Sequence, residues 1–280
     1  MRHIVRLLKQ LALAPAVLVT VDAVRGSVPR EPGAWMAVFA DQAIGTIGGG
    51  HLEFEALREA RERLCRVAAS AGSPLPQALP DPGALRRFVL GPSLGQCCGG
   101  EVQLRFEPVT VADAALLQRR LAPALVPVAL FGGGHVGQAL ARVLAELPLA
   151  VHWIDSRDGV FPSETPGHVS CEHSDPVQGA VPTLAAGSRV LIMSFSHAED
   201  LDVVAACLKR QRQRADLPFI GLIGSQTKWA TFRHRLQERG FSTQELAQVT
   251  CPIGLSGIVG KQPEVIAVAV AAQILQTLTA

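Results

Sequence analysis

The sequence predicts an α/β protein in which an N-terminal mixed α/β domain precedes a C-terminal Rossmann-like domain built on a parallel sheet. In the second half of the chain, apolar strand-like runs alternate with helical patterns, which is typical of a parallel sheet covered by helices on both faces. The first half instead mixes strand-like runs with one long helical pattern. We therefore expect domains at residues 1–108 and 127–280, with a linker at 109–126 that contains Pro123.

The expected elements follow from hydrophobic periodicity. In the first domain they are a helix at 3–13, strands at 17–24 and 35–39, a helix at 51–69, and strands at 87–90 and 101–107. In the second domain they are strands at 127–131, 150–154, 189–194 and 218–223, and helices at 136–147, 198–212, 226–239 and 263–278. Cys65 and Cys207 fall within helical patterns, where we expect them to fill the core.

The composition limits the class of protein. Of the 280 residues, 48% are hydrophobic and 18% are charged, which favours a well-buried globular fold. A net charge of +2 is too small to indicate nucleic acid or an anionic membrane as the main partner. The sequence has no apolar run long enough for a membrane-spanning helix, and Pro15 and Asp22 interrupt the N-terminal apolar run, which argues against a signal peptide. Scattered cysteines without a CxxC pair favour the reducing cytoplasm.

A glycine loop predicts a phosphate site in the second domain. Gly132, Gly134 and Gly137 form a GxGxxG pattern that follows an expected strand and opens an expected helix. In this motif the first glycine permits a tight turn, the second lets the backbone approach a phosphate, and the third allows close helix packing. Asp155 ends the next strand, where it is expected to accept hydrogen bonds from a ribose. A purely structural use of these glycines is the alternative.

Further polar residues follow the later strands of the expected sheet. Residues 194–197 (SFSH) come after one strand and residues 221–225 (GLIGS) after the next, so both segments are expected at the same edge as the glycine loop. His197 can serve as an acid, a base or a hydrogen-bond donor, or it can cap the following helix, and the sequence leaves both interpretations open.

The first domain carries a second set of candidate binding residues. Gly49 and Gly50 belong to a triple glycine that opens the 51–69 helix, and a helix N-terminus favours anions. His51 and Glu53 lie in the first turn, although Glu53 also has an ordinary role there because an acid complements the helix dipole. A separate loop contains Arg25, Ser27 and Arg30, and arginine side chains suit phosphate or carboxylate groups.

The most distinctive segment of the chain is Gln96-Cys97-Cys98, which glycines frame on both sides. Adjacent cysteines rarely bond to each other because the ring that they would close is strained. In an extended segment their side chains point to opposite faces, so we expect one of the two thiols to face a pocket. A thiolate suits a thiophilic metal or a sulfur-containing ligand.

Several motifs in this order resemble the xanthine dehydrogenase accessory protein family, also called XdhC/CoxI. The segments that carry the resemblance are 25–30 (RGSVPR), 45–53 (GTIGGGHLE), 94–100 (LGQCCGG), 131–137 (FGGGHVG), 221–225 (GLIGS) and 251–255 (CPIGL). Two departures lie in the second half of the chain. Residues 194–197 read Ser-Phe-Ser-His where the family usually reads Thr-His-x-His, and the usual Ile-Gly run after Leu255 is altered to SGIVG at residues 256–260.

The resemblance implies a cytoplasmic molybdenum cofactor chaperone rather than an enzyme. Such proteins bind the molybdopterin cofactor, support its sulfuration by a cysteine desulfurase, and deliver it to apo-xanthine dehydrogenase. The sequence leaves open which domain holds the cofactor, whether a dinucleotide also binds, and whether the chain forms a homodimer. The cofactor-binding residues that we expect are Arg25, Ser27, Arg30, Gly49, Gly50, His51, Glu53, Gln96, Cys97, Cys98, Gly132, Gly134, Gly137, Asp155 and His197, with Cys97 and Cys98 as contacts to the molybdenum centre.

Two other classes of function compete with the chaperone. A nicotinamide- or flavin-dependent oxidoreductase is suggested by the glycine loop and Asp155, but it leaves the double-cysteine domain without a purpose. A thiol redox sensor that uses Cys97 or Cys98 does not explain the Rossmann-like half. The absorption spectrum and the metal content of protein purified from cells that make molybdopterin distinguish these three classes of function.

Overall fold

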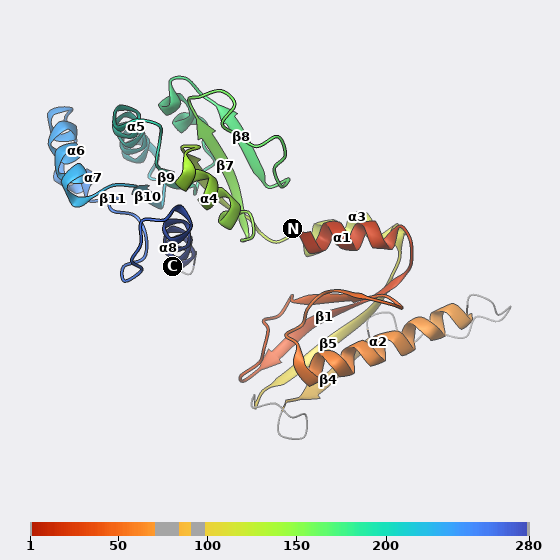
Figure 1. Cartoon of the computed structure of the whole chain (residues 1–280). Coiled ribbons are helices and arrows are strands. Elements are labelled where there is room, and N and C mark those ends of the chain that lie inside the picture. The colour runs from red at the N-terminus through yellow and green to blue at the C-terminus, as the bar shows by residue number, and fades with distance from the viewer. Residues whose placement is uncertain (1, 71–83, 91–98, 279–280) are drawn as a thin grey trace. The chain divides into compact units, whose positions relative to one another are not determined.

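The computed structural model describes residues 2–70, 84–90 and 99–278 (Figure 1). The chain divides into two compact units between Ala122 and Pro123. Much of segment 109–126, the predicted linker, therefore belongs to the first unit, where α3 packs against α1. The elements of the first unit are α1 (Arg2–Leu11), β1 (Ala16–Arg25), β2 (Trp35–Val38), β3 (Ala43–Gly45), α2 (Gly50–Ser70), β4 (Ala84–Val89), β5 (Glu101–Val109), η2 (Val111–Asp113) and α3 (Ala114–Leu121).

The described part of the first unit is built on an antiparallel sheet of five strands in the order β3-β2-β1-β5-β4. Side chains alternate along β1, because successive residues of a strand point to opposite faces. Val19 packs in the core beneath α2, whereas Leu18 packs with Leu7 of α1 and Leu117 of α3. The sheet is therefore covered on both faces, by α2 on one side and by α1 and α3 on the other.

The inner face of α2 also buries a charge. Arg63 is 8% exposed, and its guanidinium carbon lies 4.6 Å above the ring centre of Phe106 in β5. The same guanidinium donates a 2.6 Å hydrogen bond to Glu59 one turn earlier in the helix. Stacking and ion pairing together compensate for the loss of water around Arg63, and they fix α2 against the sheet.

The second unit, residues 123–278 as described, contains a parallel sheet of six strands in the order β11-β10-β9-β6-β7-β8. The direction of strand order reverses between β6 and β9, which makes the carboxyl ends of these two strands the expected ligand crevice. The elements are β6 (Val126–Phe131), α4 (His135–Leu144), β7 (Leu149–Asp155), β8 (Val169–His173), η3 (Val177–Thr183), β9 (Arg189–Ile192), α5 (His197–Arg214), β10 (Phe219–Leu222), α6 (Gln226–Glu238), α7 (Thr243–Leu246), β11 (Val249–Thr250) and α8 (Pro263–Gln276).

Helices cover both faces of this parallel sheet, as the alternation of strands and helices predicts. Phe131 of β6 packs in a core with η3, α5 and α6, whereas its neighbour Leu130 packs with α4 and α8 on the opposite face. The predicted fold class is thereby confirmed: a mixed α/β first half and a Rossmann-like parallel second half. Among the described residues, no helix combines the length and the apolar content needed to cross a lipid bilayer.

The turn after β6 depends on close backbone packing. Gly132 has a φ of +119°, and a Cβ atom at this position would lie 2.0 Å from the carbonyl oxygen of Met193. A Cβ atom at Gly137 would lie 2.0 Å from the carbonyl oxygen of Gly132. A Cβ atom at Gly134, by contrast, would meet no atom within 4 Å. Packing within this unit thus explains the first and third glycines of the motif but leaves the second unexplained.

We expect Gly137→Ala to lower the free energy of unfolding by at least about 2 kcal/mol, because the added methyl group meets a main-chain oxygen that cannot rotate away. The matched control is Gly134→Ala, for which the site has room and which should cost less than about 1 kcal/mol as a poorer helix cap. Urea denaturation of the full chain measures both variants. Equal stability of the two would contradict the packing argument.

Candidate functional site

Three motif segments of the first unit lie together in the structure. A Cβ atom at Gly26 would lie 3.3 Å from Cα of Gly100, and one at Gly100 would lie 2.3 Å from the carbonyl oxygen of Ser27. On the other side of the same loop, a Cβ atom at Gly48 would lie 2.6 Å from Cβ of Pro29. Loop 25–30 is therefore packed between the triple glycine and the glycine pair that ends the double-cysteine motif.

Glu53 organises the loop that precedes α2. Its Oε2 atom accepts hydrogen bonds from the hydroxyl of Thr46 at 2.5 Å, from the amide of Ile47 at 3.0 Å and from the amide of Gly49 at 3.1 Å. The carboxylate thus supplies the negative charge that the N-terminus of α2 favours. The ordinary role that the sequence allowed for Glu53 is the one that the structure displays.

Glu53 occupies the amides beside the triple glycine, and loop 25–30, which packs against Gly48, carries two arginines. Arg25 and Ser27 are exposed, and neither side chain has a hydrogen-bond or ion-pair partner among the described residues. The side chain of Arg30 is 38% exposed and lies 3.2 Å from that of Glu31. His51, at the start of α2, is exposed and lies 3.8 Å from Glu55. Arg25 is thus exposed without a partner among the described residues, whereas Arg30 donates a hydrogen bond to Glu31.

The double cysteine itself is not described. Gln96, Cys97 and Cys98 lie outside the described residues, whereas Gly99 and Gly100, which follow them directly in the chain, are described. No group of three or more metal-ligating side chains occurs among the residues that the structure covers.

In the second unit, Asp155 holds the glycine loop in place. The residue is 1% exposed, and its carboxylate accepts a 2.6 Å hydrogen bond from the amide of Gly133. Arg157 fills the remaining acceptor positions through its amide, Nε and Nη2 atoms, each at 2.9 Å. Since the chain's own groups take these positions, a ribose would have to displace Arg157 in order to reach the carboxylate.

The same hydrogen bonds set the ionisation of Asp155. Burial by itself raises the pKa of this carboxyl, but hydrogen bonds from the Arg157 side chain and backbone and from the Gly133 amide outweigh burial, so the pKa lies below its ordinary value of 3.8. Asp155 is therefore a charged structural group at neutral pH.

The segment after β9 presents an aromatic ring and a capped helix. Ser196 is the N-cap of α5, since its hydroxyl accepts from the amide of Glu199, and the interpretation of His197 as the cap is therefore wrong. His197 is exposed at the first position of α5, and its ring lies edge-on to Phe232, 6.4 Å between centres. Phe195 is 65% exposed, and the guanidinium carbon of Arg157 lies 4.5 Å from its ring centre.

A buried ion pair at the same sheet edge was missed by sequence reasoning. Asp200 is 2% exposed and accepts a 2.6 Å hydrogen bond from Nζ of Lys228, which also donates to the carbonyl of Ile223 at 2.9 Å. The other carboxylate oxygen of Asp200 accepts from the amide of Ser194 at 2.7 Å. Burial raises the pKa of Asp200, and Lys228 opposes that rise. The pair joins the first turns of α5 and α6 beneath the crevice, and only the position of these residues shortly after two predicted strands could have indicated it.

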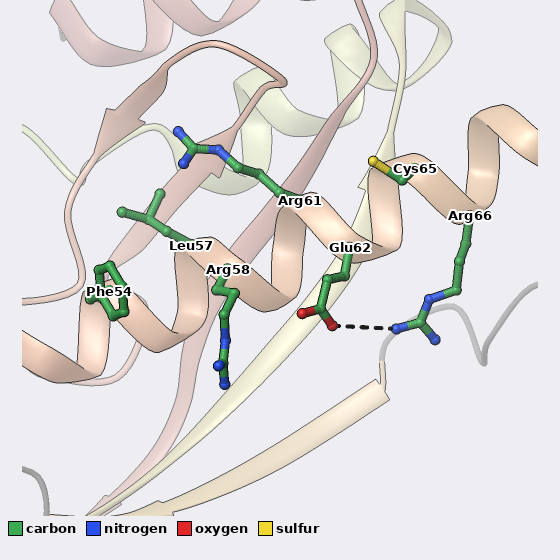
Figure 2. Close-up of a pocket in the computed structure, with 7 residues that line it drawn as sticks. All are labelled: Phe54, Leu57, Arg58, Arg61, Glu62, Cys65 and Arg66. Carbon is green, nitrogen blue, oxygen red and sulfur yellow. Dashed lines mark ion pairs between the residues drawn. The ribbon is translucent and has the colours of Figure 1, made fainter.

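A shallow groove of about 660 Å³ runs along the outer face of α2 (Figure 2). Phe54 and Leu57 give it an apolar surface, and Arg58 and Arg61 project from the same helix. Cys65 also lines this groove and is exposed, so the expectation that it fills the core is wrong. Cys207, in contrast, is completely buried, and burial raises the pKa of its thiol to about 12. None of the residues that line this groove is one of the predicted binding residues.

The fold and these two sets of glycine-supported loops define a protein with a Rossmann-type second half and a distinct first half. The sequence profile of the XdhC Rossmann domain matches residues 128–274, more than half of the chain, and the profile of the XdhC and CoxI family matches residues 12–71. The chain belongs to the XdhC family.

Two individual proteins are similar to this chain. It is 27% identical over 263 residues to the uncharacterized protein YqeB of Escherichia coli (strain K12); the alignment covers 90% of this chain but 41% of YqeB, so the chain spans less than half of that relative. A crystal structure from Bacillus halodurans, described as a xanthine dehydrogenase, has a TM-score of 0.75 and 19% identity over 99% of this chain and 96% of that one. The likeness at this identity shows the fold alone.

We expect Glu53→Gln to lower the free energy of unfolding by about 2 kcal/mol, because three donors lose a charged acceptor. Glu62→Gln is the matched control on the same helix, since Glu62 is exposed and its nearest approach to Arg66 is 3.8 Å, and it should change stability by less than about 0.5 kcal/mol. Chemical denaturation compares them. If Glu53→Gln lowers the free energy of unfolding no more than the control does, Glu53 does not hold the loop.

Asp155 should also make stability depend on acid pH. A carboxyl with a lowered pKa in the folded state contributes stability above its unfolded value, and this contribution disappears as the pH falls through the lower folded value. We expect the urea midpoint of the wild type to fall more steeply between about pH 4 and pH 2 than that of Asp155→Asn, which is less stable at neutral pH. Asp41→Asn, at an exposed position, should keep the wild-type slope. Parallel slopes for wild type and Asp155→Asn would exclude this linkage.

Proposed function

We propose that this protein is a molybdenum cofactor chaperone that acts in the maturation of xanthine dehydrogenase. In this role it binds the molybdopterin form of the cofactor as cargo, supports its sulfuration by a cysteine desulfurase in the cytoplasm, and delivers it to the apoenzyme. Membership of the XdhC family supports an accessory role connected with xanthine dehydrogenase. The protein is then a carrier, and its own residues bind and release the cargo without chemical turnover.

The observation that carries the proposal is the packing of loop 25–30 between Gly48 and Gly100. This packing joins the arginine loop, the triple glycine and the end of the double-cysteine motif into one region of the first unit. Molybdopterin offers an anionic phosphate together with sulfur and a soft metal, and these chemistries match arginine side chains and thiolates, respectively. We therefore propose that Arg25 and Arg30 hold the phosphate of the cargo.

We propose Cys97 and Cys98 as the soft ligands of the cargo, with Gln96 beside them. We propose that one of the two thiols contacts the cofactor, because neighbouring side chains of an extended segment diverge. Alanine variants of each cysteine should therefore differ from each other in the amount of molybdopterin that they retain through gel filtration. We also propose for this site the residues that belong to the same loop or to the start of α2, namely Ser27, Gly49, Gly50 and His51.

Transfer sets a thermodynamic condition on such a carrier. The apoenzyme must bind the cofactor more tightly than the chaperone does, and each 1.4 kcal/mol of difference in binding free energy is about tenfold in the transfer equilibrium. An exposed arginine site that closes around a phosphate without burying a large apolar surface fits moderate, reversible binding.

We expect apo-xanthine dehydrogenase to gain more activity from sulfurated cofactor preloaded on this protein than from the same amount of free cofactor. Arg25→Ala and Arg30→Ala should each retain about tenfold less molybdopterin, since a charged hydrogen-bond partner of the phosphate is lost. Arg58→Ala, on the outer face of α2, is the control and should retain the wild-type amount. Equal activation with free and preloaded cofactor, or steady oxidation of NADH or NADPH by the chain alone, would decide against the chaperone.

A further inference from the structure

The outer face of α2 carries a row of side chains that the core does not use. The inner face of this helix packs on the sheet through Leu52, Ala56 and Ala60, which are completely buried. The groove of about 660 Å³ runs along the opposite face from Phe54 to Arg66, which is about three turns of helix (Figure 2). Residues three and four apart in a helix share a face, so these side chains present one continuous surface to solvent.

One end of this groove is apolar. Phe54 is 60% exposed, and Leu57, which follows it on α2, is half-buried and also lines the groove. A large aromatic side chain that stays in water within a concave surface is typical of an interaction site, because its burial against a partner releases the water around it. Phe54 therefore provides an anchor for an apolar side chain of a partner protein.

The groove is also basic. Among the described residues that line it, Arg58, Arg61 and Arg66 are accompanied by one carboxylate, that of Glu62. Arg58 donates a 2.5 Å hydrogen bond to Glu55, and Arg66 lies 3.8 Å from Glu62. Arg61 is exposed and has no hydrogen-bond or ion-pair partner among the described residues. The excess of positive charge around Arg61 is complementary to carboxylates of a partner.

The groove begins at the region that we propose for the cargo. The ring centre of His51, which belongs to that region, lies 6.0 Å from the ring centre of Phe54. His51 directly follows the triple glycine, and Gly48 of that segment packs against Pro29 of loop 25–30. A partner seated on Phe54 would therefore lie beside the cargo region.

We infer that this groove is the docking surface for apo-xanthine dehydrogenase. The inference rests on the proposed carrier function, because a carrier that transfers its cargo directly has to bring the apoenzyme next to the cargo region. The segment that fits the groove is an acidic amphipathic helix of the apoenzyme. Such a helix matches a straight groove of about three turns, with one apolar side chain against Phe54 and a carboxylate against Arg61.

The test compares two substitutions in the full chain, Phe54→Ala and Arg61→Glu. We expect each to weaken binding to apo-xanthine dehydrogenase about tenfold in biolayer interferometry, because one removes the apolar anchor and the other places a like charge against the acidic helix. Raising the salt concentration should weaken binding of the wild type more than binding of Arg61→Glu. Both variants should retain the wild-type amount of molybdopterin through gel filtration, since neither residue belongs to the proposed cargo site.

The matched controls lie on α3, which covers the opposite face of the sheet. Leu116 is 53% exposed, and Arg119 is an exposed arginine. Leu116→Ala and Arg119→Glu make comparable chemical changes away from the groove and should bind the apoenzyme as the wild type does. Because all four substituted side chains are exposed, thermal unfolding of every variant should match that of the wild type, and a loss of binding is then attributable to the groove.

Three results would overturn the inference. If the wild type does not bind the apoenzyme, or if either Phe54→Ala or Arg61→Glu binds it as tightly as its control, the groove is not the docking surface. If the wild type sediments as a dimer and Phe54→Ala as a monomer, the groove belongs to a second copy of this chain. Failure of the carrier function has a different signature, since the wild type then retains no molybdopterin whatever its affinity for the apoenzyme.

Discussion

The arrangement of the second unit depends on main-chain atoms that approach one another where a side chain would prevent it. Gly132 lies against the carbonyl of Met193, and Gly137 lies against the carbonyl of Gly132. The first contact brings the end of β6 next to the segment after β9, and the second allows α4 to pack closely against the end of β6. These two approaches, together with the hydrogen bond from the Gly133 amide to Asp155, help to place the glycine loop and the residues on both sides of it.

The first unit uses a related solution. Gly100 lies against the carbonyl of Ser27, and Gly48 lies against the ring of Pro29. In each unit one carboxylate then accepts hydrogen bonds from main-chain amides of such a loop. Glu53 accepts from Ile47 and Gly49, and Asp155 accepts from Gly133. Backbone amides that are commonly available to an external anion are thus partly satisfied from within the chain. At the borders of these loops, Arg25 in the first unit and Phe195 in the second remain exposed to solvent.

Much of this fold could be predicted from the sequence because its elements are long and strongly patterned. The four main helices of the second unit and strands β6, β7, β9 and β10 were expected close to where they occur, since each combines an apolar run with a clear boundary. Strand β8 was not expected, because Val169–His173 is mostly polar and exposed at the edge of the sheet. Strand β11 has two residues, too few for any periodicity. Helical spacing alone also misplaced Cys65, which lies on the outer rather than the inner face of α2.

The candidate sites were harder to predict than the fold. The glycine patterns located both loops. They could not reveal that Arg157 donates hydrogen bonds to the Asp155 carboxylate or that Lys228 forms an ion pair with Asp200, because such contacts depend on side-chain directions across neighbouring strands.

The close approach of Gly137 to Gly132 also limits how this sequence can evolve. The atom that a new side chain at position 137 would strike is a carbonyl oxygen, and every amino acid placed at position 132 carries the same oxygen. No compensating exchange of side chains at the contact can restore the space. Genetic suppressors of a substitution at Gly137 should therefore act by stabilising distant parts of the unit or by restoring the glycine codon itself.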